Sequence, residues 1–93
     1  MGTKKVDYSK TGIGKLPNNK PVVYKIETEG GKNNYTGVAK RGRVQERIQE
    51  HLGDIPGSSV RIQQVGSVKE AEEKEARIIN RSQPKYNKQG KKS

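Results

Sequence analysis

Residues 22–37 read VVYKIETEGGKNNYTG, and this stretch decides the fold. Val22 to Thr28 is β-branched or apolar at most positions, whereas Glu29 to Asn33 contains residues that tolerate positive φ. The pattern predicts a strand, a turn and a second, antiparallel strand. If the pairing register is odd, Tyr24 and Tyr35 project from one sheet face as opposite or diagonal neighbours. They are then either ordinary half-buried strand residues or two walls of one pocket.

A short helix is predicted after the hairpin, over Arg43 to Leu52, because apolar residues recur every four positions and Gly53 follows as a cap. Beside the apolar stripe runs a second one with the same spacing, made of Arg43, Arg47 and His51. Arginine offers a planar fork of donors, and histidine can donate a hydrogen bond or transfer a proton. This second stripe is either a solvated basic face or a set of phosphate ligands.

A third strand and a second helix are predicted next. Val60 to Val65 begins with strand-like alternation. Ser67 is placed to cap a helix that runs to about Arg81, with Glu70 completing a capping box and Pro84 preventing further extension.

Glu75 falls in the middle of the apolar face predicted for that second helix. The other members of this face are Val68, Ala71, Ile78 and Ile79. A carboxylate in such a place costs free energy unless a cation, a metal or hydrogen-bond donors compensate it. Two explanations are open, namely a partly buried salt bridge to an arginine or ligation of a metal.

The composition points to a polyanionic partner. The chain has 93 residues and a formal net charge of +10, which favours nucleic acid through charge attraction. An anionic membrane competes, but no apolar run approaches the roughly 18 residues of a spanning helix and the amino terminus lacks a signal-peptide stretch. We therefore expect a cytoplasmic protein without membrane contact. The absence of cysteine excludes disulfides and cysteine-based zinc sites, and the single histidine excludes multi-histidine metal sites.

The chain is predicted to hold one folding unit between two basic ends. Residues 1–20 are basic, aperiodic and interrupted by glycine and proline, so we expect a flexible arm. Most Val, Ile and Leu residues fall within residues 21–88, which we expect to be the folded domain. Residues 89–93 form a basic tail.

Taken in order, the candidate residues resemble the GIY-YIG nuclease family over residues 22 to 87. The elements that carry the resemblance are Tyr24, Tyr35-Thr36-Gly37, Arg47 with His51, Glu75, and Asn87 in Pro84-Lys85-Tyr86-Asn87. The segment from Glu75 to Asn87 is also similar to that of family members in bacterial excision repair, with the same separation of twelve residues. Each element is weak evidence, but all of them in order form a fairly specific signal.

The resemblance implies an α/β (α+β) fold with a three-stranded antiparallel sheet flanked by helices. It also implies metal-dependent cleavage of a phosphodiester bond, with Tyr35 as general base, Tyr24 beside it, and Arg47 and His51 on the phosphate. Glu75 would hold one divalent metal, Mg²⁺ or alternatively Mn²⁺, because magnesium takes one or two carboxylates plus waters and substrate oxygens. An isolated tyrosine has a pKa of about 10, so this role requires that the metal and basic neighbours favour the phenolate.

One more position of the family pattern is present, and at another position the sequence departs from that pattern. Asn87 is expected to fix the loop beneath the site by hydrogen bonding. Val38 stands where repair nucleases carry a lysine, so we expect Lys40 or Arg41 to supply that charge and, with Arg43, to contact nucleic acid.

The expected partner is DNA, with RNA left open, and a partner protein that reads DNA sequence is a further candidate. Two alternatives remain. The chain is either a basic nucleic-acid-binding module that does not cut, or the same nuclease acting as a secreted toxin domain with an immunity partner.

Overall fold

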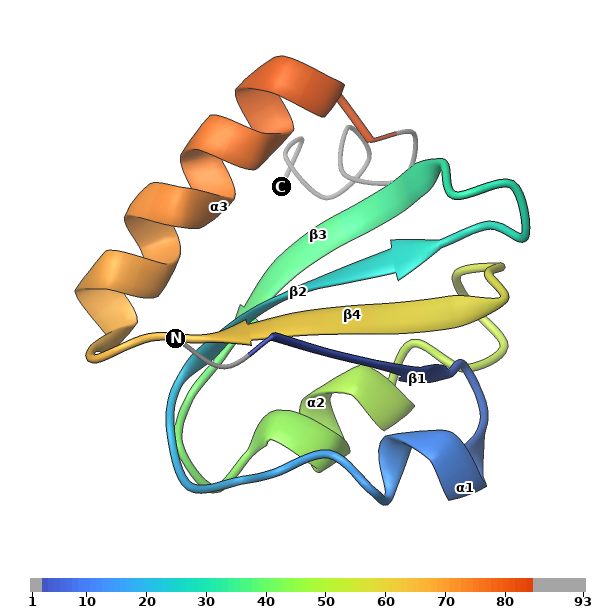
Figure 1. The fold of residues 1–93 in the computed structure, drawn as a ribbon, viewed down its shortest axis with the longest axis horizontal. Coiled ribbons are helices and arrows are strands. Elements are labelled where there is room, and N and C mark those ends of the chain that lie inside the picture. The colour runs from blue at the N-terminus through green and yellow to red at the C-terminus, as the bar shows by residue number, and fades with distance from the viewer. Residues whose placement is uncertain (1–2, 85–93) are drawn as a thin grey trace.

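The computed structural model of the protein describes residues 3–84 and contains a sheet between two helical layers (Figure 1). The elements of this part are, in chain order, β1 (Thr3–Asp7), α1 (Lys10–Ile13), β2 (Val22–Glu27), β3 (Asn33–Ala39), α2 (Val44–Gln49), β4 (Ser59–Gln64) and α3 (Val68–Ser82). The four strands are antiparallel to their neighbours in the order β1-β4-β2-β3. The α/β class with an antiparallel sheet is confirmed.

The predicted hairpin is formed by β2 and β3. Tyr24 is paired with Gly37, and Ile26 with Tyr35, so the two tyrosines are diagonal neighbours on one sheet face. Gly31 has φ of 90° in the turn, which glycine adopts at no steric cost. The expectation of a shared face is therefore confirmed.

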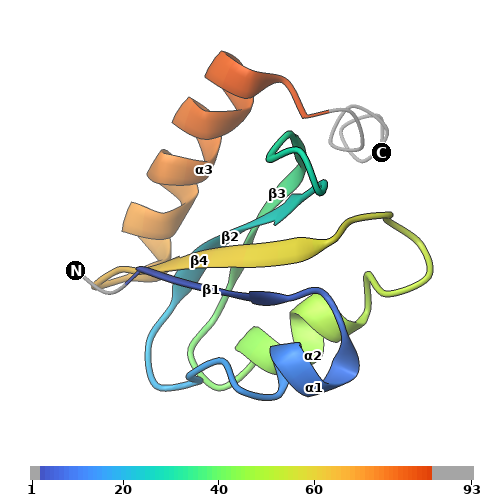
Figure 2. The same ribbon diagram turned by 45° about the vertical axis from the view of Figure 1, so that its right-hand side comes forward.

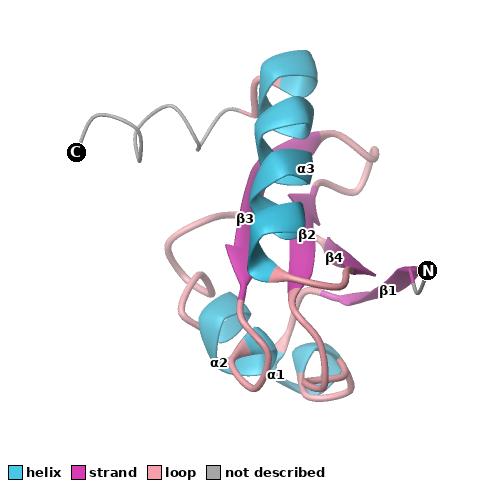
Figure 3. Cartoon of the chain, turned by 90° about the vertical axis from the view of Figure 1, so that its left-hand side faces the viewer, coloured by secondary structure: helices cyan, strands magenta, loops and turns pink. Residues whose placement is uncertain are grey.

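The two faces of the sheet have different characters. Tyr24, Ile26 and Ile62 face α1 and α2 and belong to the main hydrophobic core. Alternation along the strands places Val23, Lys25 and other partly polar residues on the opposite face, which α3 covers by packing on β3 and β2 (Figures 2 and 3). The layer under α3 is therefore more polar than the core.

The predicted count of three strands is wrong, because β1 adds a fourth strand to the sheet. β1 pairs with β4 through Lys4↔Ile62 and Val6↔Val60. An edge strand with exposed lysines has little apolar periodicity of its own, and its partner lies more than fifty residues further along the chain. Neither property is visible as a local pattern.

The predicted flexible arm over residues 1–20 is also wrong for the residues described. Ile13 and Leu16 are fully buried in the main core. Asn18 acts as a cap for α2, because its Oδ1 accepts hydrogen bonds from the backbone N–H groups of Val44 and Gln45 at 2.9 Å and 3.2 Å. This amino-terminal segment is part of the domain and supports the start of α2.

The remaining elements agree closely with expectation. α2 begins after Arg43, β4 covers the predicted third strand, and α3 follows Ser67, whose Oγ accepts from the Glu70 N–H. The Glu70 carboxylate accepts from Gly66 N–H instead of completing the predicted reciprocal bond to Ser67. Over residues 3–84, no helix is long and apolar enough to cross a membrane. The predicted tail 89–93 lies outside the described residues.

Gly12 offers a direct test of the amino-terminal packing. A Cβ at Gly12 would overlap the backbone carbonyl oxygen of Asp7, whereas one at Gly30 would meet nothing within 4 Å. We expect Gly12→Ala to lower the free energy of unfolding by about 1–3 kcal/mol or more through overpacking. Urea denaturation measures this change, with Gly30→Ala as the matched control. Equal stability of the two variants would contradict the packing of this segment onto the domain.

Candidate active site

A cleft of about 420 Å³ opens beside β3, the strand at one edge of the sheet. α2 and α3, which cover opposite faces of the sheet, both contribute residues to it. The residues that line it are Tyr35, Gly37, Val38, Ala39, Lys40, Arg43, Arg47, Val68, Glu72 and Glu75. The fold thus brings three of the predicted catalytic residues, Tyr35, Arg47 and Glu75, to one cavity.

Tyr24 and His51 lie directly behind the cleft wall that Tyr35 forms. Tyr24 is fully buried and its hydroxyl is 2.8 Å from Nε2 of His51. The ring centroid of Tyr35 is 6.1 Å from that of Tyr24 and 4.6 Å from that of His51. The three rings therefore form one contiguous cluster, with Tyr35 as the member that reaches the cleft.

Gly37 is required for the approach of the two tyrosines. A Cβ at this position would lie 2.6 Å from the Tyr24 hydroxyl oxygen and 2.9 Å from Cε2 of Tyr35. Gly37 is paired with Tyr24 across the hairpin, so the phenol crosses the glycine at the point where a side chain would stand. This explains physically why the second tyrosine motif ends in glycine.

Burial shifts the protonation of both Tyr24 and His51. Desolvation raises the pKa of Tyr24, as do the charges of Tyr35 and Glu75, while the Arg47 guanidinium opposes this rise. Burial also lowers the pKa of His51, and the nearby Arg47 charge lowers it further. At neutral pH, Tyr24 is therefore a neutral phenol in contact with a neutral imidazole.

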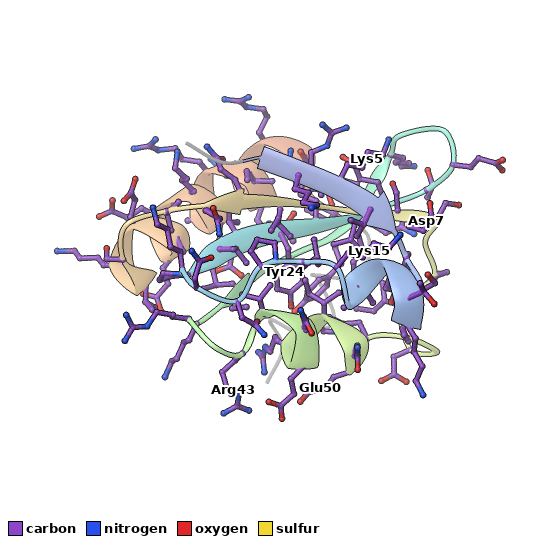
Figure 4. All side chains as sticks on the ribbon, turned by 60° about the horizontal axis from the view of Figure 1, so that its bottom comes forward. Lys5, Asp7, Lys15, Tyr24, Arg43 and Glu50 are labelled. Carbon is purple, nitrogen blue, oxygen red and sulfur yellow. The ribbon has the colours of Figure 1, made fainter. Side chains whose placement is uncertain are left out.

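The predicted basic residues separate into those in the cleft and one outside it. Lys40, Arg43 and Arg47 line the cleft, whereas Arg41 is exposed and is not among the lining residues. Arg43 and Arg47 form exposed ion pairs with Glu46 and Glu50 at 3.1 Å and 3.9 Å, and such pairs hold side chains only weakly. Figure 4 shows Arg43 and Glu50 extending outward from α2. Both arginines can thus turn toward an anion.

Lys40 is better placed than Arg41 to replace the lysine missing at Val38. Val38 itself lines the cleft, and Lys40 follows two residues later with its side chain at the same cavity. The structure therefore supplies a cation close to the position where the sequence departs from the family pattern.

The acidic wall of the cleft belongs to α3. Glu75 is half-buried and lines the cleft with Glu72, one turn earlier. Over residues 3–84, no three His, Cys, Asp or Glu side chains gather into a group that could hold a metal. The donors present fit magnesium only in its sparsely ligated form, with one or two carboxylates, several waters and substrate oxygens. Asn87, the last predicted site residue, lies outside the described residues.

Two residues that sequence reasoning missed hold the site from behind. The Tyr8 hydroxyl donates to the carbonyl oxygens of His51 and Ile55 at 2.6 Å and 2.7 Å, and burial followed by the Asp54 charge raises its pKa to about 12. Asn18 fixes the start of α2, on which Arg43 and Arg47 stand. Both lie in the segment predicted to be a flexible arm, and no local pattern connects them to the site.

Comparisons with models of protein families and with curated protein sequences find no match. Function is therefore inferred from the geometry of the site and the resemblance carried by its residues.

His51 provides a proton-sensitive probe of this cluster. Its pKa should lie below the usual value of about 6.5, because the buried, neutral form is favoured. The unfolded chain then binds a proton near pH 6.5 while the folded protein does not. Stability should be fully retained above that pH and fall as pH drops toward the folded pKa. Since the chain has one histidine, its imidazole resonance in an NMR titration is unambiguous.

The same titration tests the proximity of Arg47. Arg47→Gln should raise the pKa of His51 by removing a neighbouring positive charge, whereas Arg43→Gln, one turn earlier on α2, should leave it nearly unchanged. Equal shifts in the two variants would mean that the cluster is not arranged as described.

Proposed function

We propose that the protein is a metal-dependent endonuclease that hydrolyses phosphodiester bonds, with DNA as the expected substrate. The observation that carries this proposal is the convergence of a tyrosine, an arginine and a glutamate on one cleft. Tyr35 comes from β3, Arg47 from α2 and Glu75 from α3, and each stands in the order of the GIY-YIG pattern.

The charge distribution across the cleft favours a phosphodiester ligand. Lys40, Arg43 and Arg47 supply cations on one side, and Arg43 and Arg47 can present planar forks of donors to phosphate oxygens. Glu72 and Glu75 supply carboxylates on the other side, where a bare phosphate would be repelled. A site lined by both positive and negative side chains suits a phosphate that binds together with a divalent cation.

Glu75, with Glu72 beside it, would hold this cation. When bound, a magnesium ion stabilises the charge that develops on the phosphate and on the leaving oxygen. Glu75 is half-buried and lines the cleft.

Tyr35 is the residue assigned to proton transfer. In the proposed step, its phenolate accepts a proton from water as the water oxygen bonds to phosphorus. The bond from phosphorus to the leaving oxygen breaks, and that oxygen takes a proton from solvent. Arg47 lines the same cleft, so its guanidinium would stabilise the charge that develops on the phosphate.

Tyr24 and His51 are assigned positioning roles in this mechanism. Tyr24 is fully buried with a raised pKa, so its phenol is a poor base. Its bond to His51 instead fixes the imidazole whose ring packs on Tyr35. His51 thus influences the phosphate through the position of the Tyr35 ring.

The two alternatives differ from this proposal in measurable ways. A binding module that does not cut would retain DNA affinity in EDTA and would show no cleavage with magnesium. A toxin domain would share the chemistry, and its expression would arrest growth through the same Glu75-dependent reaction.

Cleavage of plasmid DNA and labelled RNA, with and without Mg²⁺ or Mn²⁺, tests the proposal. We expect metal-dependent cleavage that Glu75→Gln reduces below detection, because the carboxylate would hold the metal. Tyr35→Phe should lower the rate by about 10²–10⁴-fold, the usual contribution of a general base.

Glu73→Gln is the matched control, because Glu73 is exposed on the same helix and does not line the cleft. It should cleave like the parent protein. The proposal fails if the parent shows no metal-dependent cleavage, or if Glu73→Gln and Glu75→Gln lose activity equally.

A further inference from the structure

α3 carries opposite charges on its two flanks. Glu72 and Glu75 lie on the flank that faces the β3 edge and the cleft. Lys74, Arg77 and Arg81 are spaced by three and four residues, which places them together on the other flank. The part of this flank from Lys74 to Arg81 is therefore basic, whereas Glu70 and Glu73 lie beside it in the first half of the helix.

A second cavity lies beneath the basic flank, between α3 and the polar face of the sheet. It measures about 190 Å³ and is lined by Lys25, Gln63, Lys74, Arg77, Ile78, Arg81 and Ser82. Among the described residues, its lining contains four cations and no acid. Uncompensated cations in a concave surface concentrate a positive potential and attract anions.

This basic groove continues in both directions along the sheet. A neighbouring cavity of about 210 Å³ shares Lys25, Gln63 and Ile78 with it and extends to Arg61, which pairs with Glu27 at 3.6 Å. Another shares Lys25 and Ser82 with it and extends to Glu27 and to Lys32 in the hairpin turn. Lys25 is thus the common point of an elongated surface.

We infer that this basic groove binds the phosphodiester backbone of a nucleic-acid strand, at a site separate from the candidate active site. Lys74 to Arg81 spans about 10 Å along the helix, at 1.5 Å per residue. This length matches the axial rise of about three base pairs of a duplex, at 3.4 Å each. An elongated row of cations is better matched to consecutive phosphates than to one small anion.

Hydrogen-bond donors strengthen this assignment. Ser82 and Gln63 stand among the lining residues, and hydroxyl and amide groups commonly contact phosphate oxygens beside arginine and lysine. Such contacts fix the position of a strand without reading its bases. The groove would therefore raise affinity for nucleic acid uniformly across sequences.

Binding to a short labelled duplex, followed by fluorescence anisotropy in EDTA across a range of salt concentrations, tests this inference. The triple variant Lys74→Gln/Arg77→Gln/Arg81→Gln should reduce the slope of log K against log salt by about 2–3, because each phosphate that is no longer neutralised lowers it by about 0.9. The control Lys4→Gln/Lys10→Gln/Lys15→Gln removes the same charge from exposed positions outside the groove and should change the slope by less than about 1.

Equal slopes for the two triple variants would overturn the inference, because they would show attraction to net charge alone. NMR titrations with the duplex and with inorganic tripolyphosphate separate the two sources of phosphate. If tripolyphosphate shifts the resonances of residues 74–82 and the duplex does not, a nucleic-acid strand is rejected as the occupant. Neither measurement requires cleavage. The groove inference can therefore be rejected while the nuclease proposal stands, and the nuclease proposal can be rejected while the groove inference stands.

Discussion

The fully buried phenol of Tyr24 is the constraint around which the site is organised. A buried hydroxyl left without a hydrogen bond costs about 1–3 kcal/mol, so the fold must bring a partner to it. That partner is His51, which lies 27 residues away in the turn after α2. Tyr8 holds the same turn from the other side through the carbonyl oxygens of His51 and Ile55. The hydrogen bond of the Tyr24 hydroxyl therefore links β2 to the turn after α2, and the bonds of Tyr8 link that turn to the amino-terminal segment.

α2 depends on this support because it is too short to be stable alone. It has six residues, and isolated helices shorter than about 12–15 residues are marginal in water. Val44 and Ile48 anchor it in the core, while Asn18 and the bonds from Gln45 to Gly14 and Leu16 carbonyls fix its start. The arginines of the cleft are thus positioned by residues far away in sequence.

The hairpin, α2, β4 and α3 could be predicted because each has a local signal. Glycines mark the turn after β2, and apolar residues at helical spacing mark α2 and α3. β1 and α1 have no comparable signal, since their burial depends on pairing with β4 and on single residues such as Ile13 and Leu16. For the same reason, Tyr35, Arg47 and Glu75 could be predicted as candidates, whereas the supporting roles of Tyr8 and Asn18 could not.

The polar layer beneath α3 explains why one helix can serve two surfaces. Because the main core lies on the other face of the sheet, α3 covers Lys25, Gln63 and other polar residues without enclosing them in a dry interior. A carboxylate on one flank and cations on the other can therefore remain accessible. A second apolar core in this place would have been more stabilising, but it would have excluded both charged cavities.

The difference between the two tyrosines follows from the same asymmetry. Tyr24 points into the main core, where burial raises its pKa and its hydroxyl is committed to His51. Tyr35 stands on β3, the edge strand, and lines the open cleft. The two phenols are identical in chemistry but differ in position, so that the buried ring orders the cluster and the edge ring reaches the cleft. A proton acceptor is useful only where water and phosphate can reach it, and in this pair that place belongs to Tyr35.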